Sequence, residues 1–477
     1  MGIAFVPLYI QYLGMEAFGL IGVFAILQAS FAVLDFGMTP TLNREMARYM
    51  AGAHSVQSIR DLLRSLEIIC FGTAFLIAAV IYGSATWLAT HWLKAEVLSI
   101  NIVAEAMVMM GFVVALRFVE GLYRGAIIGL QKQVWLSAVS ALLATIRGGG
   151  AAFVLIQIKS DIGTFFIWQF IISAVSLFVV IFAVYRALPA SLNRARFSII
   201  QLKQIQRFAS AMMATSILSL LLMQVDKVIL SRVLSLEMFG YYSLAGTVAS
   251  ILTMLMVPIY QAYFPRFTQL VTLEDNVGVA RSYHQGAQLM SVFVIPAALV
   301  LIFFGENILL LWTGKASLAH NVAPLLALLA FGTMLNGLMH IPYMLTLAYG
   351  WPGFAVRQNI IAVIILVPAV LWATPRYGAI GAAWIWLILN SAYLLIGMHF
   401  IHRRLLHSEK WSWYWNDVSL PLISAVIVGT AFWKMQPESM STLTSWLWIL
   451  AAGIAMSASA ALAAPLLRKQ FFEIIIK

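Results

Sequence analysis

Ionisable side chains inside apolar segments are the residues of this sequence with the clearest chemical potential. Arg147 lies near the middle of an apolar stretch over residues 134–157 and is followed by Gly148, Gly149 and Gly150. Placing a guanidinium at such a depth costs roughly 2.5–3.5 kcal/mol, and this group keeps its proton. It therefore either binds a phosphate or carboxylate in a wet cavity or forms a buried pair with an acidic neighbour.

A second charged set shares one face of the segment over residues 102–123. Arg117, Glu120 and Arg124 are three and four residues apart, so a helix places them on the same side. Glu120 is expected to pair with one arginine, which leaves one positive charge on that face for an anionic group. Lys227 is a further candidate for substrate binding.

Asp35 is a candidate for ion coupling or for internal pairing. It falls in the apolar segment over residues 19–42, and the second half of the chain has no acidic residue at the matching position. Such a carboxylate could carry a coupling proton or a sodium ion. It could equally bond Arg147 or a loop amide. Glu120 is assigned to the same class of coupling or pairing residues.

Two further pairs of polar residues lie in apolar segments. Asp226 and Lys227 are adjacent, so a helix turns them about 100° apart and they do not simply neutralise each other. His340 lies four residues after Asn336, and the two face the same side of a helix. A histidine in a membrane is a candidate proton site, and packed, satisfied polarity is the alternative.

No motif for ATP binding, metal binding or catalysis occurs. A Gly-rich loop followed by Lys is absent, so ATP is not the direct energy source, and there is no HExxH or paired metal-ligand motif. Cys70 is the single cysteine, which excludes an intrachain disulfide and a cysteine-based metal cluster. The sequence thus predicts no catalytic residue, no metal and no cofactor.

The composition predicts that the helices carrying these side chains span a membrane. Only 10% of residues are charged and the mean hydropathy is +0.93, far from the range of soluble globular domains. The net charge of +11 is explained by basic loops on one side of a membrane, not by nucleic acid binding. A spanning helix needs roughly 20 apolar residues. On that measure we read fourteen segments, near residues 1–13, 19–42, 66–90, 102–123, 134–157, 164–185, 208–233, 240–263, 288–312, 323–347, 358–373, 379–400, 419–433 and 446–467.

A repeated phrase indicates two copies of one structural unit. The sequence LGMEAFG at residues 13–19 returns as LSLEMFG at residues 234–240, an offset of 221. Within one residue, the same offset relates Arg44 to Arg266, Trp92 to Trp312 and Tyr123 to Tyr343. Paired apolar repeats are typical of carriers, with the substrate path between the halves. By this alignment the first helix is truncated, about fourteen residues shorter than its counterpart.

The predicted fold is an all-α polytopic membrane protein with two pseudo-symmetric six-helix bundles plus two C-terminal helices. We expect an N-terminal bundle over residues 1–190, a basic cytoplasmic linker over 191–207, a C-terminal bundle over 208–405 and two appended helices with a tail over 406–477. Alternate loops and the C-terminal tail hold 20 of the 29 Lys and Arg, and the opposite loops hold six. This bias places both chain termini in the cytoplasm.

Several motifs, in their order and spacing over roughly residues 1–400, resemble a known family. They are the opening phrase at residues 13–22, Leu34-Asp35-Phe-Gly, Gly121-Leu-Tyr-Arg124-Gly, Asp226-Lys227, Phe264-Pro265-Arg266 and His340-Ile-Pro342-Tyr343. They resemble bacterial oligosaccharide (O-antigen type) flippases of the multidrug/oligosaccharidyl-lipid/polysaccharide exporter superfamily. The resemblance implies two six-helix bundles around a central cavity. It also implies that undecaprenyl-diphosphate-linked glycan units are flipped from the cytoplasmic to the periplasmic leaflet.

The sequence therefore predicts a carrier of the bacterial inner membrane, not an enzyme, that works by alternating access. Arg147, Arg117 and Arg124 are expected to attract the diphosphate of a lipid-linked anionic glycan. Other expected partners are membrane lipids and a glycan polymerase complex, with no nucleic acid. Two alternatives remain open. An ion-coupled multidrug or cation exporter of the same fold would favour acidic cavity residues, and a membrane glycan polymerase or ligase would need a larger outward loop.

Overall fold

The computed structural model describes residues 5–50, 52, 54–189, 194–203, 205, 224–437 and 440–469. Within these ranges the ordered elements are helices, and extended pairing is limited to one isolated bridge between Lys94 and Ser235. Ten described helices are long and apolar enough to cross a membrane. The predicted all-α polytopic fold is confirmed.

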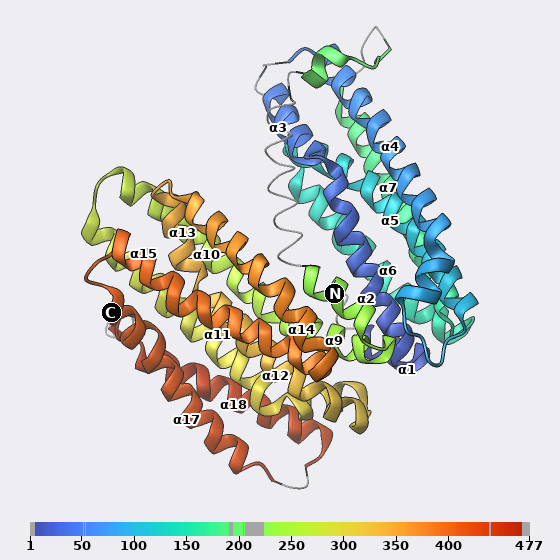
Figure 1. The fold of residues 1–477 in the computed structure, drawn as a ribbon. Coiled ribbons are helices and arrows are strands. Elements are labelled where there is room, and N and C mark those ends of the chain that lie inside the picture. Colours follow the sequence, from blue (N-terminus) through green and yellow to red (C-terminus); the bar gives the residue numbers. More distant parts are fainter. Residues whose placement is uncertain are drawn as a thin grey trace. The chain divides into compact units, whose positions relative to one another are not determined.

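Contacts divide the chain into two compact units, Met1–Gly240 and Tyr241–Lys477. The first unit is drawn from blue to green in Figure 1. Its elements, in chain order, are α1 (Val6–Leu13), α2 (Met15–Phe31), the 3-10 turn η2 (Ala32–Asp35), α3 (Met38–Met50), α4 (Val56–Trp87), the π-turn η3 (Leu88–Trp92), α5 (Ile100–Gly129), α6 (Gln133–Gln157) and α7 (Ile162–Ala187). Helix α9 (Leu236–Ala249) begins at the end of this unit.

Helix α5 is the centre of the first unit. It packs against α2, α3, α4 and α7, and α6 packs against α7. Small residues allow this close approach. A Cβ on Gly125 would lie 2.7 Å from the backbone oxygen of Thr39, so α3 rests directly on the α5 backbone. Leu42, Leu66, Leu122 and Val180 belong to the buried apolar cluster that these helices share.

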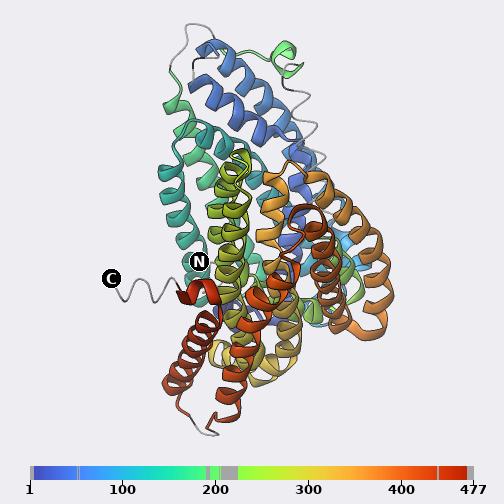
Figure 2. The same ribbon diagram turned by 90° about the vertical axis from the view of Figure 1, so that its left-hand side faces the viewer.

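The second unit, drawn from green to red in Figure 1, is organised around α11. Its helices are α10 (Ile251–Thr272), α11 (Asn276–Thr313), α12 (Ala316–Leu338), α13 (His340–Ala348), α14 (Pro352–Ala392), η4 (Tyr393–Gly397), α15 (Met398–Leu405), α16 (Lys410–Ser412), η5 (Trp413–Ser419), α17 (Leu420–Lys434) and α18 (Thr442–Ala463). Helix α11 packs against α10, α12, α13, α17 and α18. The hairpin of α17 and α18, seen in both views, is thereby attached to this unit (Figure 2).

The ten spans and the fourteen predicted segments differ for local reasons. Segments 1–13 and 19–42 form shorter helices, because Gly14 at φ 83° separates α1 from α2 and the turn over residues 32–37 ends α2. Segments 358–373 and 379–400 run together through a kink at Gly378, where φ is 62°. Most of the segment 208–233 and part of the linker 191–207 lie outside the described residues.

The repeated phrase packs against its own second copy. A Cβ on Gly19 of α2 would collide with the backbone oxygen of Leu236, and one on Gly240 of α9 would lie 2.8 Å from the oxygen of Met15. Only glycine lets the two helix backbones approach so closely. The glycines at the end of each copy are therefore explained by one helix crossing.

The glutamate of the first copy has a structural role as well. The Glu16 carboxylate accepts hydrogen bonds from three successive backbone N–H groups in the loop before α5, which belong to Glu96, Val97 and Leu98 at 2.5, 2.9 and 2.8 Å. A carboxylate that collects several backbone donors fixes a loop without a counter-ion. Glu16 thus ties the start of α2 to the loop that leads into α5.

Candidate functional site

Arg117 is held in the interior of the first unit by neutral groups. Its guanidinium on α5 donates to the Gln28 oxygen at 2.7 Å, to the Gln169 oxygen at 2.9 Å and to the Ser173 hydroxyl at 3.3 Å. The guanidinium carbon also lies 5.0 Å from the ring centre of Phe24. These contacts orient the side chain but leave its positive charge in place.

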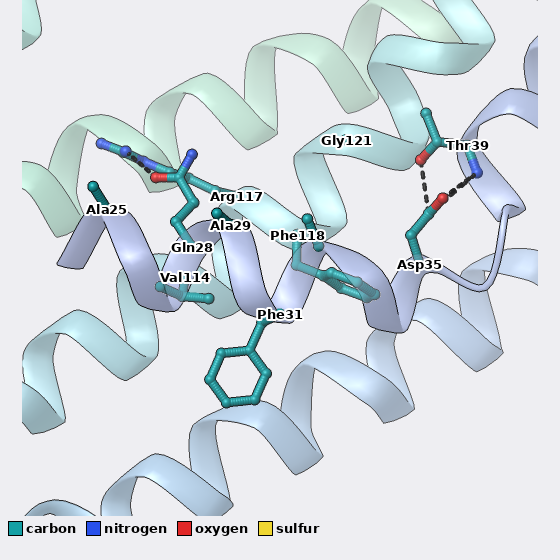
Figure 3. Close-up of a pocket in the computed structure, with 11 residues that line it drawn as sticks. Ala25, Gln28, Ala29, Phe31, Asp35, Thr39, Val114, Arg117, Phe118 and Gly121 are labelled. Atoms are coloured by element: carbon teal, nitrogen blue, oxygen red, sulfur yellow. Dashed lines mark hydrogen bonds between the residues drawn. The ribbon is translucent and has the colours of Figure 1, made fainter. Parts of the chain in front are cut away.

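A cavity of about 440 Å³ lies beside Arg117 (Figure 3). Arg117 and Gln28 occupy one end, while Asp35 and Thr39 occupy the other, with the ring of Phe118 between them. The remaining lining residues are mostly small or apolar: Ala25, Ala29, Phe31, Ala32, Val114 and Gly121. The volume lies within the range of small-molecule pockets. One end of the cavity offers a cation and the other a carboxylate.

Asp35 bonds the first turn of α3. Its carboxylate accepts from the Thr39 backbone N–H at 3.1 Å and from the Thr39 hydroxyl at 2.8 Å. Of the internal partners considered from the sequence, the structure therefore gives Asp35 an amide and not Arg147. The contact also holds the carboxylate at the edge of the cavity.

Glu120 pairs with Arg124 on the same helix. The Arg124 guanidinium lies 3.0 Å from the Glu120 carboxylate and donates to the Ser140 hydroxyl on α6 at 2.9 Å. The Ser176 hydroxyl on α7 donates to the same Glu120 oxygen at 2.8 Å. This pair neutralises Arg124 and links three helices, so Arg117 keeps the unmatched charge of the set.

Arg147 is half-buried on α6 and, among the described residues, has no ion pair. Its Nε is buried without a hydrogen-bond partner in that part of the chain. It interacts electrostatically with Glu120 and Arg124, and Arg117 interacts electrostatically with it. We call these four residues of the first unit, Arg117, Arg124, Arg147 and Glu120, the arginine cluster; of the four, Arg117 lines the cavity.

The glycines after Arg147 are covered by aromatic rings. A Cβ on Gly148 would lie 2.5 Å from the Phe5 ring, and one on Gly150 would collide with the Trp168 indole. The Trp168 indole N–H donates to the backbone oxygen of Arg147 at 3.2 Å. These glycines allow the two aromatic rings to pack closely against the helix backbone.

The other predicted site residues lie apart in the sequence and have internal contacts. Asp226 and Lys227 are half-buried in helical residues before α9, and each interacts within the protein. His340 begins α13 in the second unit, with its ring centre 4.8 Å from that of Tyr260. Asn336 donates to Asn390 at 2.9 Å. Asn336 is therefore a polar side chain whose hydrogen bond is made inside the protein.

Sequence comparison identifies the family of the chain. A sequence model described as polysaccharide biosynthesis protein matches residues 1–271, more than half of the 477 residues. The chain belongs to this polysaccharide biosynthesis protein family. A second model, MatE, matches residues 211–372. The family resemblance predicted from the sequence motifs is confirmed.

Similar proteins are transporters. The chain is 21% identical over 388 residues to a protein of Shigella flexneri named "Putative O-antigen transporter", covering 79% of this chain and 87% of that protein. Among solved structures, the lipid II flippase MurJ in an inward closed conformation matches with a TM-score of 0.70 and 13% identity, over 100% of this chain and 97% of that one. An inward-facing multidrug resistance MATE transporter matches with a TM-score of 0.67 and 12% identity, over 84% and 94% of the two chains.

These structural matches show that the fold of this family member is similar to the folds of MurJ and the MATE transporter. The neutral partners of Arg117 were not predicted from the sequence. Gln169 and Ser173 are polar residues within an apolar helix, so a search for amides and hydroxyls in spanning segments could have found them.

Proposed function

We propose that this protein flips undecaprenyl-diphosphate-linked oligosaccharide units from the cytoplasmic to the periplasmic leaflet by alternating access. The observation that carries the proposal is the charge of the arginine cluster. The cluster has three arginines and one glutamate. Of these three arginines, Arg124 is the one that forms an ion pair with a carboxylate of the described residues. Two positive charges are thus left for a ligand, and a diphosphate diester carries one negative charge on each phosphorus.

Arg117 and Arg147 have different roles in this proposal. Arg117 is fixed by Gln28, Gln169 and Ser173, so it presents an oriented guanidinium beside the cavity. Arg147 has a buried Nε that bonds none of the described residues, so an entering anion can add hydrogen bonds that this part of the chain does not make. Arg124, neutralised by Glu120, supports the site, and Lys227 is assigned to the substrate path.

Transport is proposed to be coupled to the movement of an ion, which binds a carboxylate or a histidine among the residues predicted for coupling. Asp35 lines the same cavity as Arg117, so a substrate and a coupling ion would meet in one space. Glu120 is assigned a pairing role because Arg124 already occupies it. Asp226 and His340 remain the other candidates for coupling.

The cation exporter of the same fold is the alternative that MATE-like structures support. A drug cation would favour an acidic cavity, whereas the net charge of the arginine cluster is positive. The polymerase or ligase is disfavoured because the related proteins are named as transporters. We therefore favour a carrier, whose partners are the lipid-linked glycan, membrane lipids and a glycan polymerase complex.

A reconstitution experiment tests the proposed substrate. The purified protein in lipid vesicles should move an undecaprenyl-diphosphate oligosaccharide across the bilayer, measured by the glycan that an externally added glycosidase can cleave. Vesicles without protein give the background rate. Vesicles that extrude a lipophilic cation but leave the glycan in its leaflet would support the exporter and exclude the flippase.

Labelling of single cysteines tests the proposed orientation in the inner membrane. In a Cys70→Ser background, Ser408→Cys should be shielded from an impermeant thiol reagent added outside intact cells, because its loop belongs to the basic, cytoplasmic set. Ser317→Cys, in an opposite loop, should be labelled. Both serines are exposed, so access is set by the membrane and not by packing. The reverse pattern would invert the topology.

A further inference from the structure

A histidine held between two carboxylates lies in the second unit, far in sequence from the arginine cluster. The Nδ1 atom of His284 on α11 lies 2.5 Å from the Asp417 carboxylate of η5. Its Nε2 atom lies 3.0 Å from the Glu409 carboxylate, just before α16. Both ring nitrogens therefore contact acceptors contributed by two other elements.

Counting protons shows what these two contacts require. A neutral imidazole has a single N–H, and an ionised carboxylate only accepts hydrogen bonds. Two hydrogen bonds therefore need one additional proton, placed either on the ring or on Asp417. The His284 hydrogen bond holds the pKa of Glu409 below its usual range, so Glu409 stays ionised. His284, Asp417 and Glu409 therefore share this proton, and they titrate as one coupled group.

The cluster also holds the segment that follows α18. Asp417 is fully buried, and its second oxygen accepts from the Gln288 amide at 2.8 Å. The Gln288 oxygen accepts from the backbone N–H groups of Leu466 and Leu467 at 2.9 and 3.3 Å. A series of hydrogen bonds thus runs from His284 through Asp417 of η5 and Gln288 of α11 to the backbone of Leu466 and Leu467.

Neighbouring titratable groups do not supply the second hydrogen bond. The Tyr283 hydroxyl lies 3.1 Å from Nε2 of His402, whose Nδ1 lies 2.9 Å from the Met398 carbonyl. A neutral His402, with its proton on Nδ1, satisfies both of these contacts. Lys410 of α16 lies 3.2 Å from Nδ1 of His399, and Tyr414 of η5 bonds the Leu394 carbonyl. The Glu409 carboxylate also accepts a hydrogen bond from the Ser408 hydroxyl at 2.9 Å.

We propose that His284, Asp417 and Glu409 form a proton-binding site that fastens α17, α18 and the following segment to α11. With the proton bound, each ring nitrogen donates to an acceptor and Asp417 is satisfied in its buried position. Loss of the proton leaves two carboxylates with one N–H between them. The buried Asp417 then loses a partner, and the attachment of the C-terminal helices weakens. This inference does not depend on the transported substrate.

The direction of the pH effect follows from the proton count. A histidine in the unfolded chain loses its proton above about pH 6.5. The folded site keeps the proton to higher pH, so the folded state binds more protons over that range. The stabilisation is therefore complete below about pH 6.5 and is lost as the pH rises through the titration of the site.

Thermal unfolding of the full-length protein in detergent tests the proposal. Between pH 6 and pH 9, the apparent Tm of the wild type should fall by about 2–4 °C. Asp417→Asn should remove this dependence, because its NH2 group can donate to Nδ1 while Nε2–H donates to Glu409, so a neutral ring suffices. His320→Gln is the control: His320 is exposed and contacts Glu306 through one nitrogen at 3.2 Å, so this variant should follow the wild type.

Hydrogen exchange provides a second measurement. After correction for the intrinsic pH dependence, exchange of the Leu466 and Leu467 amides should accelerate with pH in the wild type and not in Asp417→Asn. His284→Gln should exchange rapidly at every pH, since glutamine does not bridge both carboxylates as a donor. A pH-dependent Tm that persists unchanged in Asp417→Asn, or pH-independent exchange in the wild type, would overturn the proton site.

Discussion

Replacing Arg147 with alanine should slow flipping of a lipid-linked glycan at least about 30-fold while the protein still folds and reaches the membrane. Removing one partner of a buried charged hydrogen bond costs about 2–5 kcal/mol, and about 1.4 kcal/mol corresponds to a tenfold change. The loss should appear in transport and not in stability. Arg147 has no ion pair among the described residues, so alanine leaves no carboxylate unmatched.

The charge of Arg147 should matter more than its shape. Arg147→Lys keeps the positive charge but loses the forked geometry, so it should retain part of the activity. Arg147→Glu should be at least as inactive as the alanine variant. In cells, lipid-linked glycan should accumulate on the cytoplasmic side for both inactive variants, measured with a leaflet-specific assay.

Arg232→Ala is the matched control for loss of one arginine charge. Arg232 is exposed and lies over the Trp92 ring, with 5.1 Å between the guanidinium and the ring centre. Its removal should leave flipping close to the wild-type rate. Full activity of a well-expressed Arg147→Ala protein would remove this residue from the substrate path.

The sequence was sufficient to predict the helical membrane fold and the pairing of Glu120 with one arginine. Hydropathy gives both results, since long apolar runs must be helices and an ionisable residue inside one needs a nearby partner. Arg117 and Arg124 both lie within one turn of Glu120, so helix geometry predicts an ion pair but does not decide that Arg124 is the partner. The repeated glycines at residues 19 and 240 also carried information, because both mark one close crossing of helices.

The pattern of apolar and polar residues did not predict where helices break or which distant residues form hydrogen bonds. A positive φ at Gly14 or Gly378 depends on how the flanking helices pack, and many glycines in membrane helices remain helical. The amides that hold Arg117 come from positions 52 and 89 residues away. Asp417 lies 133 residues from His284. Such contacts depend on tertiary packing, which no local spacing specifies.

The three glycines after Arg147 show why a run of small residues does not specify its surroundings. Small side chains are compatible with an open surface or with the close approach of a large neighbour. Here Phe5 and Trp168 occupy the space. The helix backbone that follows Arg147 is therefore packed against two aromatic rings and is not open to an anion.

Gln169→Glu should have the second large effect, by neutralising Arg117 with almost no change in shape. Gln169 is buried, and its oxygen accepts from Arg117 at 2.9 Å. A glutamate of the same length keeps this hydrogen bond and adds one negative charge. At an effective dielectric constant of about 20, two charges 4 Å apart interact by about 4 kcal/mol, so the new pair should strongly reduce the attraction of Arg117 for a diphosphate. We expect flipping to fall at least about tenfold.

The cost of losing the hydrogen bond alone is measured by Gln169→Met. Methionine has a similar length but no acceptor, so it disturbs the orientation of Arg117 and keeps its charge. Its effect on flipping should be smaller than that of glutamate. Gln157→Glu, at an exposed position near the end of α6, controls for the added charge and should stay within about twofold of the wild type.

Gln28→Glu repeats the test on a different helix. The Gln28 side chain is exposed and accepts from the other arm of Arg117 at 2.7 Å, so folding is less at risk than with a buried substitution. Both glutamate variants should lose glycan flipping. An exporter of cations would respond in the opposite sense, because each variant makes the cavity more acidic. Unchanged glycan flipping in well-folded Gln169→Glu and Gln28→Glu proteins would mean that the charge of Arg117 does not act on the substrate.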